Sequence, residues 1–199
     1  MSDVMRNDVE AFQDVYSDDY ERYEIINGEK CSMGSPASYH QSIVSALHLQ
    51  IGKYLEEKPC RVFPAAAVNL TNALFNSKNI IDISKTHRYI PDIVVICDDT
   101  YDEFGDYSGV PSLVIEVASE SMLFRDFTVK RKSYMAAKVK EYLIIIDASH
   151  VISYTLKDGK YTSASYLSDN GILKVPLSVF PDMEIILNEK EINRLVVVR

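Results

Sequence analysis

The sequence predicts an α/β protein in which a central mixed β-sheet is flanked by helices on both faces. The pattern over residues 112–146 indicates a strand, a helix and a second strand, the crossover unit that joins parallel strands. The dipeptides Asn27-Gly28 and Asp158-Gly159 each lie between strand-like segments, as in antiparallel hairpins. Both kinds of connection in one chain imply a sheet with parallel and antiparallel strands.

Helices and short strands alternate in the first half of the chain. Apolar residues at helical spacing predict a helix over 6–18. A strand that begins at residue 23 leads into the Asn27-Gly28 turn. A continuous apolar face predicts a long helix over 38–57, which Pro59 helps to end. The remaining elements expected here are short strands at 61–63 and 66–71 and a polar loop over 72–89.

The core strands are expected in the second half of the chain. Apolar runs predict strands over 91–97 and 112–118, separated by an acidic loop. A helix over 125–138 follows, and the apolar run 141–147 is typical of a strand covered on both faces. The remaining elements expected here are a hairpin at 151–156 and 161–166, short strands within 172–187, and an edge strand or tail over the last dozen residues.

Length and composition indicate a single domain over residues 1–199, with the helix 6–18 and the strands of 150–199 as appendages. No apolar stretch approaches the roughly 20 residues that cross a bilayer. The first eight residues also lack the basic start and apolar core of a signal peptide, so we expect a cytoplasmic protein without a membrane partner. The net charge of −8 argues against non-specific binding to nucleic acid, although a bound divalent cation would offset some acidity.

The three cysteines, Cys31, Cys60 and Cys97, are too few and too scattered to predict a disulfide framework. Their spacing also lacks the pattern of a metal site. We therefore expect them to be buried or unreactive thiols.

Two carboxylates and a lysine form the strongest candidate site. Asp92 precedes the apolar run 93–96, and Glu116 lies alone inside the apolar run 113–118. A buried carboxylate costs several kcal/mol unless a cation or a proton donor compensates it, so two on successive core strands suggest a shared cation. Neighbouring strands lie about 4.8 Å apart, and magnesium commonly takes one or two protein carboxylates. Lys130 adds a charge that can orient water or meet a phosphate.

Each of these residues also has a purely structural interpretation. An Asp after a Pro is common at the start of a strand, and a lone Glu in a strand often points to solvent or pairs with a lysine. The clustering of costly charges favours a functional site instead. Magnesium on Asp92 and Glu116 would suit phosphodiester hydrolysis, because the ion acts as a Lewis acid and activates water.

Several motifs occur in order between residues 20 and 147. They are Tyr23–Glu29, Ser38 with His40-Gln41, Pro91–Val95, Leu113–Ser119, and Arg125-Asp126 followed by Lys130, Tyr134 and Glu141-Tyr142. This ordered set resembles the Uma-type family of predicted restriction endonucleases, a branch of the PD-(D/E)xK nuclease superfamily. The resemblance implies a restriction-endonuclease-like mixed β-sheet flanked by helices, and cleavage of DNA that depends on Mg²⁺ or Mn²⁺.

The resemblance also implies roles for individual residues. Asp92 and Glu116 would be metal ligands, and Glu24 would join the metal shell directly or through water. The superfamily usually has a lysine two residues after the Glu, where this chain has Ala118. The resemblance implies that the lysine comes from the next helix, which points to Lys130.

Further residues are accessory candidates. Lys132 is the alternative to Lys130, and Ser119 occupies the first position of the family's usual Ser-Pro-Ser, which is Ser119-Glu120-Ser121 here. The added Glu places negative charge near the phosphate path. His40 begins the long helix, where a helix-start or core role is the alternative. Arg125 and Lys132 belong to a basic stretch that would contact DNA phosphates or form an ordinary solvated helix face.

The function expected from these observations is a metal-dependent endonuclease acting on DNA, with Asp92, Glu116 and Lys130 as its catalytic residues. A catalytically inactive nuclease-fold module for binding or assembly is the first alternative, because of Ala118 and the acidic charge. A nuclease acting on RNA is the second. A homodimer is plausible, since paired subunits commonly cut both strands of a duplex. The thirteen tyrosines suit base stacking or a tyrosine-rich core.

Overall fold

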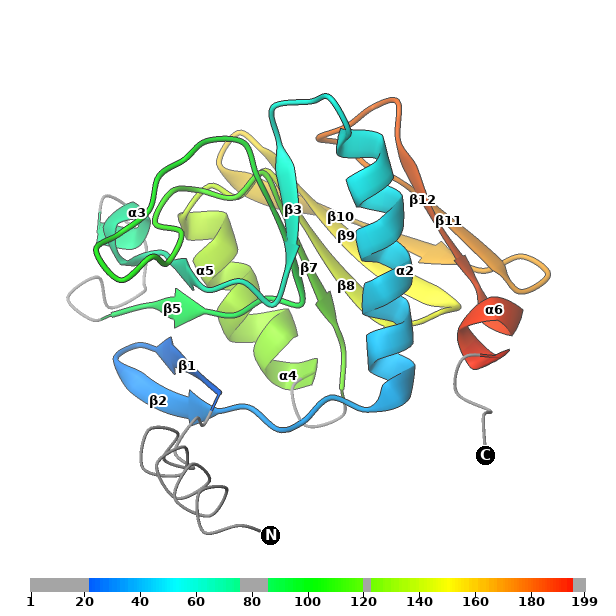
Figure 1. The fold of residues 1–199 in the computed structure, drawn as a ribbon, viewed down its shortest axis with the longest axis horizontal. Coiled ribbons are helices and arrows are strands. Elements are labelled where there is room, and N and C mark those ends of the chain that lie inside the picture. Colours follow the sequence, from blue (N-terminus) through cyan, green and yellow to red (C-terminus); the bar gives the residue numbers. More distant parts are fainter. Residues whose placement is uncertain (1–21, 76–85, 120–122, 195–199) are drawn as a thin grey trace, which may run out of the picture.

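A six-stranded sheet forms the centre of the computed structural model, which describes residues 22–75, 86–119 and 123–194 (Figure 1). Its strand order is β10-β9-β8-β7-β6-β3. β7 (Leu113–Val117) and β8 (Glu141–Asp147) are parallel, and the other neighbouring pairs are antiparallel. The predicted mixed α/β sheet is therefore confirmed, while the helix predicted over 6–18 lies outside the described residues.

The other elements surround this sheet. Its remaining strands are β3 (Arg61–Pro64), β6 (Ile93–Ile96), β9 (His150–Lys157) and β10 (Lys160–Leu167). A four-stranded sheet in the order β2-β1-β5-β4 comprises β1 (Tyr23–Ile26), β2 (Glu29–Ser32), β4 (Val68–Asn69) and β5 (Arg88–Tyr89), and β11 (Ile172–Pro176) pairs with β12 (Glu184–Asn188). The helices are α2 (Ser38–Leu55), α3 (Thr71–Phe75), α4 (Leu123–Arg125), the π-helical turn η1 (Asp126–Lys130), α5 (Arg131–Ala136) and α6 (Glu189–Arg194). None of these helices has the length and apolarity that a membrane crossing requires.

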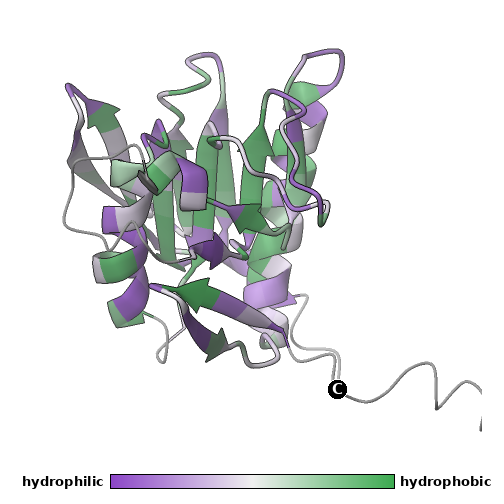
Figure 2. Ribbon diagram, turned by 90° about the vertical axis from the view of Figure 1, so that its left-hand side faces the viewer, coloured by the Kyte–Doolittle hydropathy of each residue, from purple (hydrophilic) through white to green (hydrophobic). Residues whose placement is uncertain are grey.

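The central strands are hydrophobic on both faces because each face carries a separate core (Figure 2). On one face, α2 and the β11–β12 pair cover side chains such as Ile93, Leu113 and Ile115. On the other face, Tyr134 and its neighbours cover alternate residues such as Val114. This two-sided burial explains the apolar runs in the sequence.

The turn preferences of the sequence predicted the hairpins correctly. Asn27 and Gly28 have φ angles of 52° and 76°, and β1 pairs with β2 on either side of them. Both values suit the type I′ turn that Asn-Gly favours. The long helix predicted over 38–57 is observed as α2, two residues shorter at its C-terminus.

Four predicted elements need correction. The helix expected over 125–138 is a continuous helical segment that contains the π turn η1. Within the last dozen residues, Glu189–Arg194 form the helix α6 rather than a strand or tail. The side chain of Asn188, the last residue of β12, caps this helix by accepting a hydrogen bond from the Lys190 N–H. β9 and β10 are integral to the central sheet, so the strands of 150–167 are not an appendage. The polar loop expected over 72–89 also contains most of α3 and the short strand β5.

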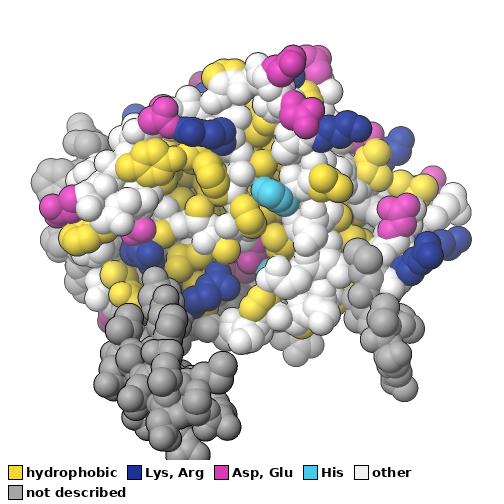
Figure 3. Space-filling view, in the orientation of Figure 1, with side chains coloured by type: hydrophobic (Ala, Val, Ile, Leu, Met, Phe, Trp, Pro, Cys, Tyr) yellow, Lys and Arg dark blue, Asp and Glu magenta, His cyan; other side chains and the backbone are white. Residues whose placement is uncertain are grey.

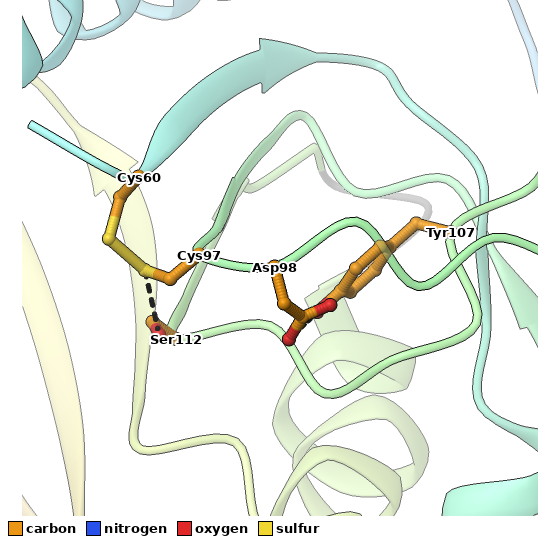
Figure 4. The surroundings of a disulfide bond; sticks show 5 residues. All are labelled: Cys60, Cys97, Asp98, Tyr107 and Ser112. Atoms are coloured by element: carbon orange, nitrogen blue, oxygen red, sulfur yellow. Dashed lines mark hydrogen bonds between the residues drawn. A yellow bond between two sulfur atoms is a disulfide. The ribbon is translucent and has the colours of Figure 1, made fainter.

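Two of the cysteines form a disulfide, which corrects the expectation of unreactive thiols. Cys60 precedes β3 and Cys97 follows β6, and the antiparallel register pairs Arg61 with Ile96 (Figure 4). One further step along each strand places the two cysteines opposite each other, and their sulfur atoms are bonded. Cys31 is a free thiol. The separation of 37 residues concealed this pairing, because only the strand register reveals it.

Reduction of the Cys60–Cys97 disulfide should lower the free energy of unfolding by about 3–4 kcal/mol, because the bond closes a long loop in the unfolded chain. Urea unfolding with and without dithiothreitol measures the loss. The double variant Cys60→Ser/Cys97→Ser should match the reduced protein and show no response to dithiothreitol, whereas Cys31→Ser should keep the full response. Equal stability of the oxidised and reduced forms would contradict the prediction.

Gly109 lies against the ring of Tyr107 in the loop that follows β6. A Cβ at position 109 would lie 2.5 Å from Tyr107 Oη and 2.7 Å from Cζ. The ring cannot retreat easily, because Tyr107 is buried and its hydroxyl donates a hydrogen bond to Asp98 at 3.2 Å (Figure 4). Gly109→Ala should therefore cost about 1–3 kcal/mol of stability. Gly34→Ala is the matched control in thermal unfolding, since a Cβ there meets nothing within 4 Å.

Candidate active site

Asp92 and Glu116 meet at one end of two neighbouring strands. The register of β6 and β7 pairs Ile93 with Ile115, so one further step places Asp92 opposite Glu116. The backbone N–H of Val117 donates a hydrogen bond to Asp92 Oδ2 at 2.7 Å, which fixes the aspartate against β7. The register therefore brings the two predicted carboxylates to neighbouring positions, although they are 24 residues apart in the chain.

Lys130 reaches these carboxylates from the helical segment that follows β7. Its Nζ lies 2.9 Å from Glu116 Oε1 and 2.9 Å from Glu24 Oε1. Asp126, one turn earlier, has its Oδ1 at 3.7 Å from the same nitrogen. Lys130 is only 1% exposed, so the π turn η1 directs both Asp126 and Lys130 into the interior.

Glu24 and Tyr134 complete the surroundings of Lys130 and Glu116. The side chains of β1 alternate, and Glu24 and Ile26 are its two buried residues. Glu24 Oε1 also accepts the N–H of Ile90 at 3.0 Å. The hydroxyl of Tyr134 donates a hydrogen bond to Glu116 Oε1 at 3.0 Å. The site thus gathers side chains from the small sheet, the central sheet and the helical segment.

Three carboxylates share one pattern: one oxygen accepts two hydrogen bonds and the other accepts none from the described residues. The doubly bonded oxygens are Asp92 Oδ2 with Val117 and His40, Glu116 Oε1 with Lys130 and Tyr134, and Glu24 Oε1 with Lys130 and Ile90. Glu24 Oε2 and Asp126 Oδ1 are moreover buried and bond to no hydrogen-bond donor within residues 22–75, 86–119 and 123–194. Buried acceptors without partners are rare, so these oxygens indicate where a cation, a proton or water belongs.

The charges within the site are unbalanced. Burial raises the pKa of Glu116 well above its ordinary value. The charge of Lys130 opposes this shift, and the neighbouring carboxylates add to it. Burial also raises the pKa of Asp126 to about 6, again against the effect of Lys130. Burial disfavours the charged form of Lys130, but the three carboxylates outweigh it and raise its pKa. Among the described residues, the buried ammonium of Lys130 therefore faces three buried carboxylates, those of Glu24, Glu116 and Asp126. Further positive charge would stabilise the site.

The free carboxylate oxygens fit a magnesium ion with few protein ligands. Within the described residues, no group of three or more His, Cys, Asp or Glu side chains is already spaced to hold a metal. Magnesium does not need such a group, because it keeps several waters and is commonly bound through one or two carboxylates. Asp92 and Glu116 each offer one oxygen that accepts no hydrogen bond from the described residues. Asp92 immediately precedes β6, and Glu116 lies at the opposed position of β7.

The family model "Uma2: Putative restriction endonuclease" matches residues 9–188. The chain belongs to the Uma2 family. Its fold also matches the crystal structure of a protein from Anabaena variabilis ATCC 29413, described as a "putative nuclease belonging to DUF820". That match has a TM-score of 0.63 at 17% identity and covers 89% of this chain and 92% of the other. No curated protein matches the sequence.

In this Uma2-family chain, the accessory candidates do not all lie at the site. His40 Nε2 lies 3.1 Å from Asp92 Oδ2. Lys132 and Ser119 are exposed, and Arg125 is half-buried. The geometry therefore brings His40 to the site and leaves Lys132 on the outer side of the helical segment. Lys130, not Lys132, is the lysine beside Glu116.

Sequence reasoning gave no site role to Asp126 and Tyr134, although both belong to the motifs of the Uma2 resemblance. Asp126 lies four residues before Lys130, the spacing at which side chains of opposite charge meet on a helix, so that spacing was an available signal. Tyr134 gave no such signal. It belongs to a series of core tyrosines, and its ring packs in a tilted geometry against those of Tyr89 and Tyr142. These rings lie in the core, and so are not available to stack on bases.

Proposed function

We propose that the protein is an endonuclease that hydrolyses DNA phosphodiester bonds with Mg²⁺ or Mn²⁺ held by Asp92 and Glu116 and assisted by Lys130. The observation that carries the proposal is the pairing of two carboxylates, each with one oxygen free of hydrogen bonds from the described residues, beside a buried ammonium. Membership of the Uma2 family of "Putative restriction endonuclease" proteins and the fold match to a "putative nuclease" support the same chemistry.

Each residue of the site would have a separate role in the proposed reaction. A bound magnesium ion would supply a Lewis acid and lower the pKa of an attacking water. Asp92 and Glu116 would hold the ion, while Val117, Lys130 and Tyr134 donate hydrogen bonds to one oxygen of each carboxylate and set the orientation of both. Lys130 keeps a positive charge at Glu116, where a phosphate or a water would approach.

DNA is the proposed substrate. The outer side of the helical segment α4–η1–α5 is the proposed contact for the phosphate backbone of the DNA. Arg125 and Lys132 lie on η1's flanking turns, within one or two turns of Lys130 along the chain. Lysine and arginine side chains in such positions neutralise phosphates, so binding should weaken as salt is added. Two copies of the chain acting together would cut both strands of a duplex.

Incubation of supercoiled plasmid with the purified protein tests the proposal directly. We expect nicked and then linear plasmid in Mg²⁺ or Mn²⁺, and intact plasmid when EDTA removes the metal, because the carboxylates alone cannot activate the water. A parallel assay on an RNA of the same sequence separates the DNA and RNA alternatives. Cleavage that persists in EDTA would contradict the proposed chemistry.

A non-catalytic binding or assembly module is the second candidate, and the distribution of charge favours it. The chain has a net charge of −8, and on the face seen in Figure 3 the Lys and Arg side chains are scattered rather than joined in one basic patch. Ala118 also stands where the superfamily usually has its lysine. This candidate predicts intact plasmid under all metal conditions and little heat when Mn²⁺ is added in a calorimeter.

A further inference from the structure

His40 approaches Asp92 from the face of the sheet opposite to Lys130. It is the third residue of α2, which packs on one face of the central sheet, whereas Lys130 belongs to the helical segment on the other face. His40 Nε2 lies 3.1 Å from Asp92 Oδ2, and the two side chains are only 15% and 18% exposed. The contact joins residues 52 positions apart, so the fold brings α2 to the site through this pair.

The surroundings of the imidazole determine its tautomer. Asp92 Oδ2 is an acceptor, so His40 Nε2 must carry a hydrogen to bond it. His40 Nδ1 is buried and has no hydrogen-bond partner among the residues that the structure describes. A hydrogen on Nδ1 would be a buried donor without an acceptor, which costs more than a bare ring nitrogen. The neutral ring with hydrogen on Nε2 satisfies both observations.

The hydrogen bond from His40 selects which oxygen of Asp92 is available. Oδ2 already accepts the Val117 N–H at 2.7 Å, and His40 adds the second donor to the same atom. Two donors on one oxygen hold the carboxylate in a single orientation, and the other oxygen is left for a ligand. The two donors come from α2 and β7, so Asp92 is held between two separate elements.

We propose that His40 is a positioning residue for the metal site: its Nε2–H holds Asp92 Oδ2 and turns Oδ1 toward the divalent cation. This inference rests on the proposed function, because it assigns Asp92 as a ligand. If His40 only filled space in the core, position 40 would need a side chain of similar volume but no hydrogen-bond donor at the position of Nε2.

Two substitutions separate these roles. The amide nitrogen of glutamine reaches about as far as Nε2, whereas that of asparagine ends near the position of Nδ1. His40→Gln should therefore bind Mn²⁺ within about 3-fold of the wild type, and His40→Asn about 10–100-fold more weakly, which is the usual effect of losing a partner that orients a metal ligand. His48→Asn, a half-buried histidine two turns later on α2, should bind as the wild type does. Calorimetry measures all three, and plasmid cleavage should follow the same order.

Nitrogen-15 NMR of the imidazole rings provides a readout that needs neither metal nor activity. The chain has four histidines, so the spectrum of His40→Gln identifies the resonances of His40 by their loss. We expect the pattern of a neutral ring protonated at Nε2. Addition of Mg²⁺ should shift these resonances and leave those of His48 unchanged.

The outcomes distinguish this inference from the proposed function. Wild-type Mn²⁺ affinity in His40→Asn, together with lost affinity in Asp92→Asn, would overturn the role of His40 alone. Wild-type affinity in Asp92→Asn would overturn the metal site and His40's role with it. A ring protonated at Nδ1 would overturn the positioning of Asp92 whatever the metal does.

Discussion

Asp92→Asn and Glu116→Gln should each lower the rate of plasmid cleavage in Mg²⁺ by more than about 100-fold. The two substitutions keep the size of each side chain and remove its charge, so the free oxygen that would bind the ion becomes a poor ligand. Loss of an outer partner of a metal ligand typically costs about 10–100-fold, and loss of the ligand itself should exceed that. Initial rates of nicking, measured over a range of Mg²⁺ concentrations, give the effect.

Matched controls separate the loss of a ligand from the loss of a charge anywhere in the molecule. Asp158→Asn makes the same chemical change at an exposed turn where φ is 50°, a conformation that asparagine tolerates. Glu184→Gln does so on the exposed side of β12. Both control variants should cleave at the wild-type rate. Unchanged cleavage by Asp92→Asn and by Glu116→Gln would remove the assigned site.

Lys130→Met should lower the free energy of unfolding near neutral pH by about 3–5 kcal/mol, because it leaves buried carboxylates without their cation. Methionine fills much of the same volume, so the loss is electrostatic rather than a packing defect. Lys130 is 1% exposed and lies 2.9 Å from both Glu24 and Glu116. Lys132→Met is the matched control, and it should change stability by less than about 0.5 kcal/mol because Lys132 is exposed.

The loss in Lys130→Met should shrink as the pH falls. Burial already raises the pKa of Glu116, and that of Asp126 to about 6, against the effect of Lys130. Without the ammonium both pKa values rise further, so the folded variant holds protons that the unfolded chain releases above its ordinary carboxyl pKa. Its stability therefore falls as the pH rises from about 5 to about 8.

The wild type lacks this added dependence. Its Lys130 pKa is raised, so the ammonium stays charged in the folded protein at any pH below the ordinary lysine value of 10.5. Urea unfolding of wild type, Lys130→Met and Lys132→Met at about pH 5 and about pH 8 gives the comparison. A deficit in Lys130→Met that is equal at both pH values would contradict the electrostatic explanation.

Local signals in the sequence were sufficient for most elements of the fold. Turn preferences at Asn27-Gly28 and Asp158-Gly159 placed two hairpins, because such preferences depend on the φ angles of a few adjacent residues. The apolar runs of β6, β7 and β8 identified the central strands, since burial on both faces leaves no polar alternation. The boundaries were less well determined. The π turn at 126–130 and the cap at Asn188 were not predicted, because the apolar patterns of the sequence do not specify them.

The sequence by itself determined that Asp92 and Glu116 are charged groups in apolar strands, because a carboxylate in such a run is conspicuous wherever the chain folds. It also carried the ordered motifs that resemble the Uma-type family and that pointed to Lys130. Only the tertiary structure decided which groups surround these carboxylates. The contacts of Glu24 with Lys130, of His40 with Asp92 and of Cys60 with Cys97 depend on strand register and helix placement. These are long-range quantities that neither spacing nor composition specifies, since residues far apart in the chain meet only once the core has formed.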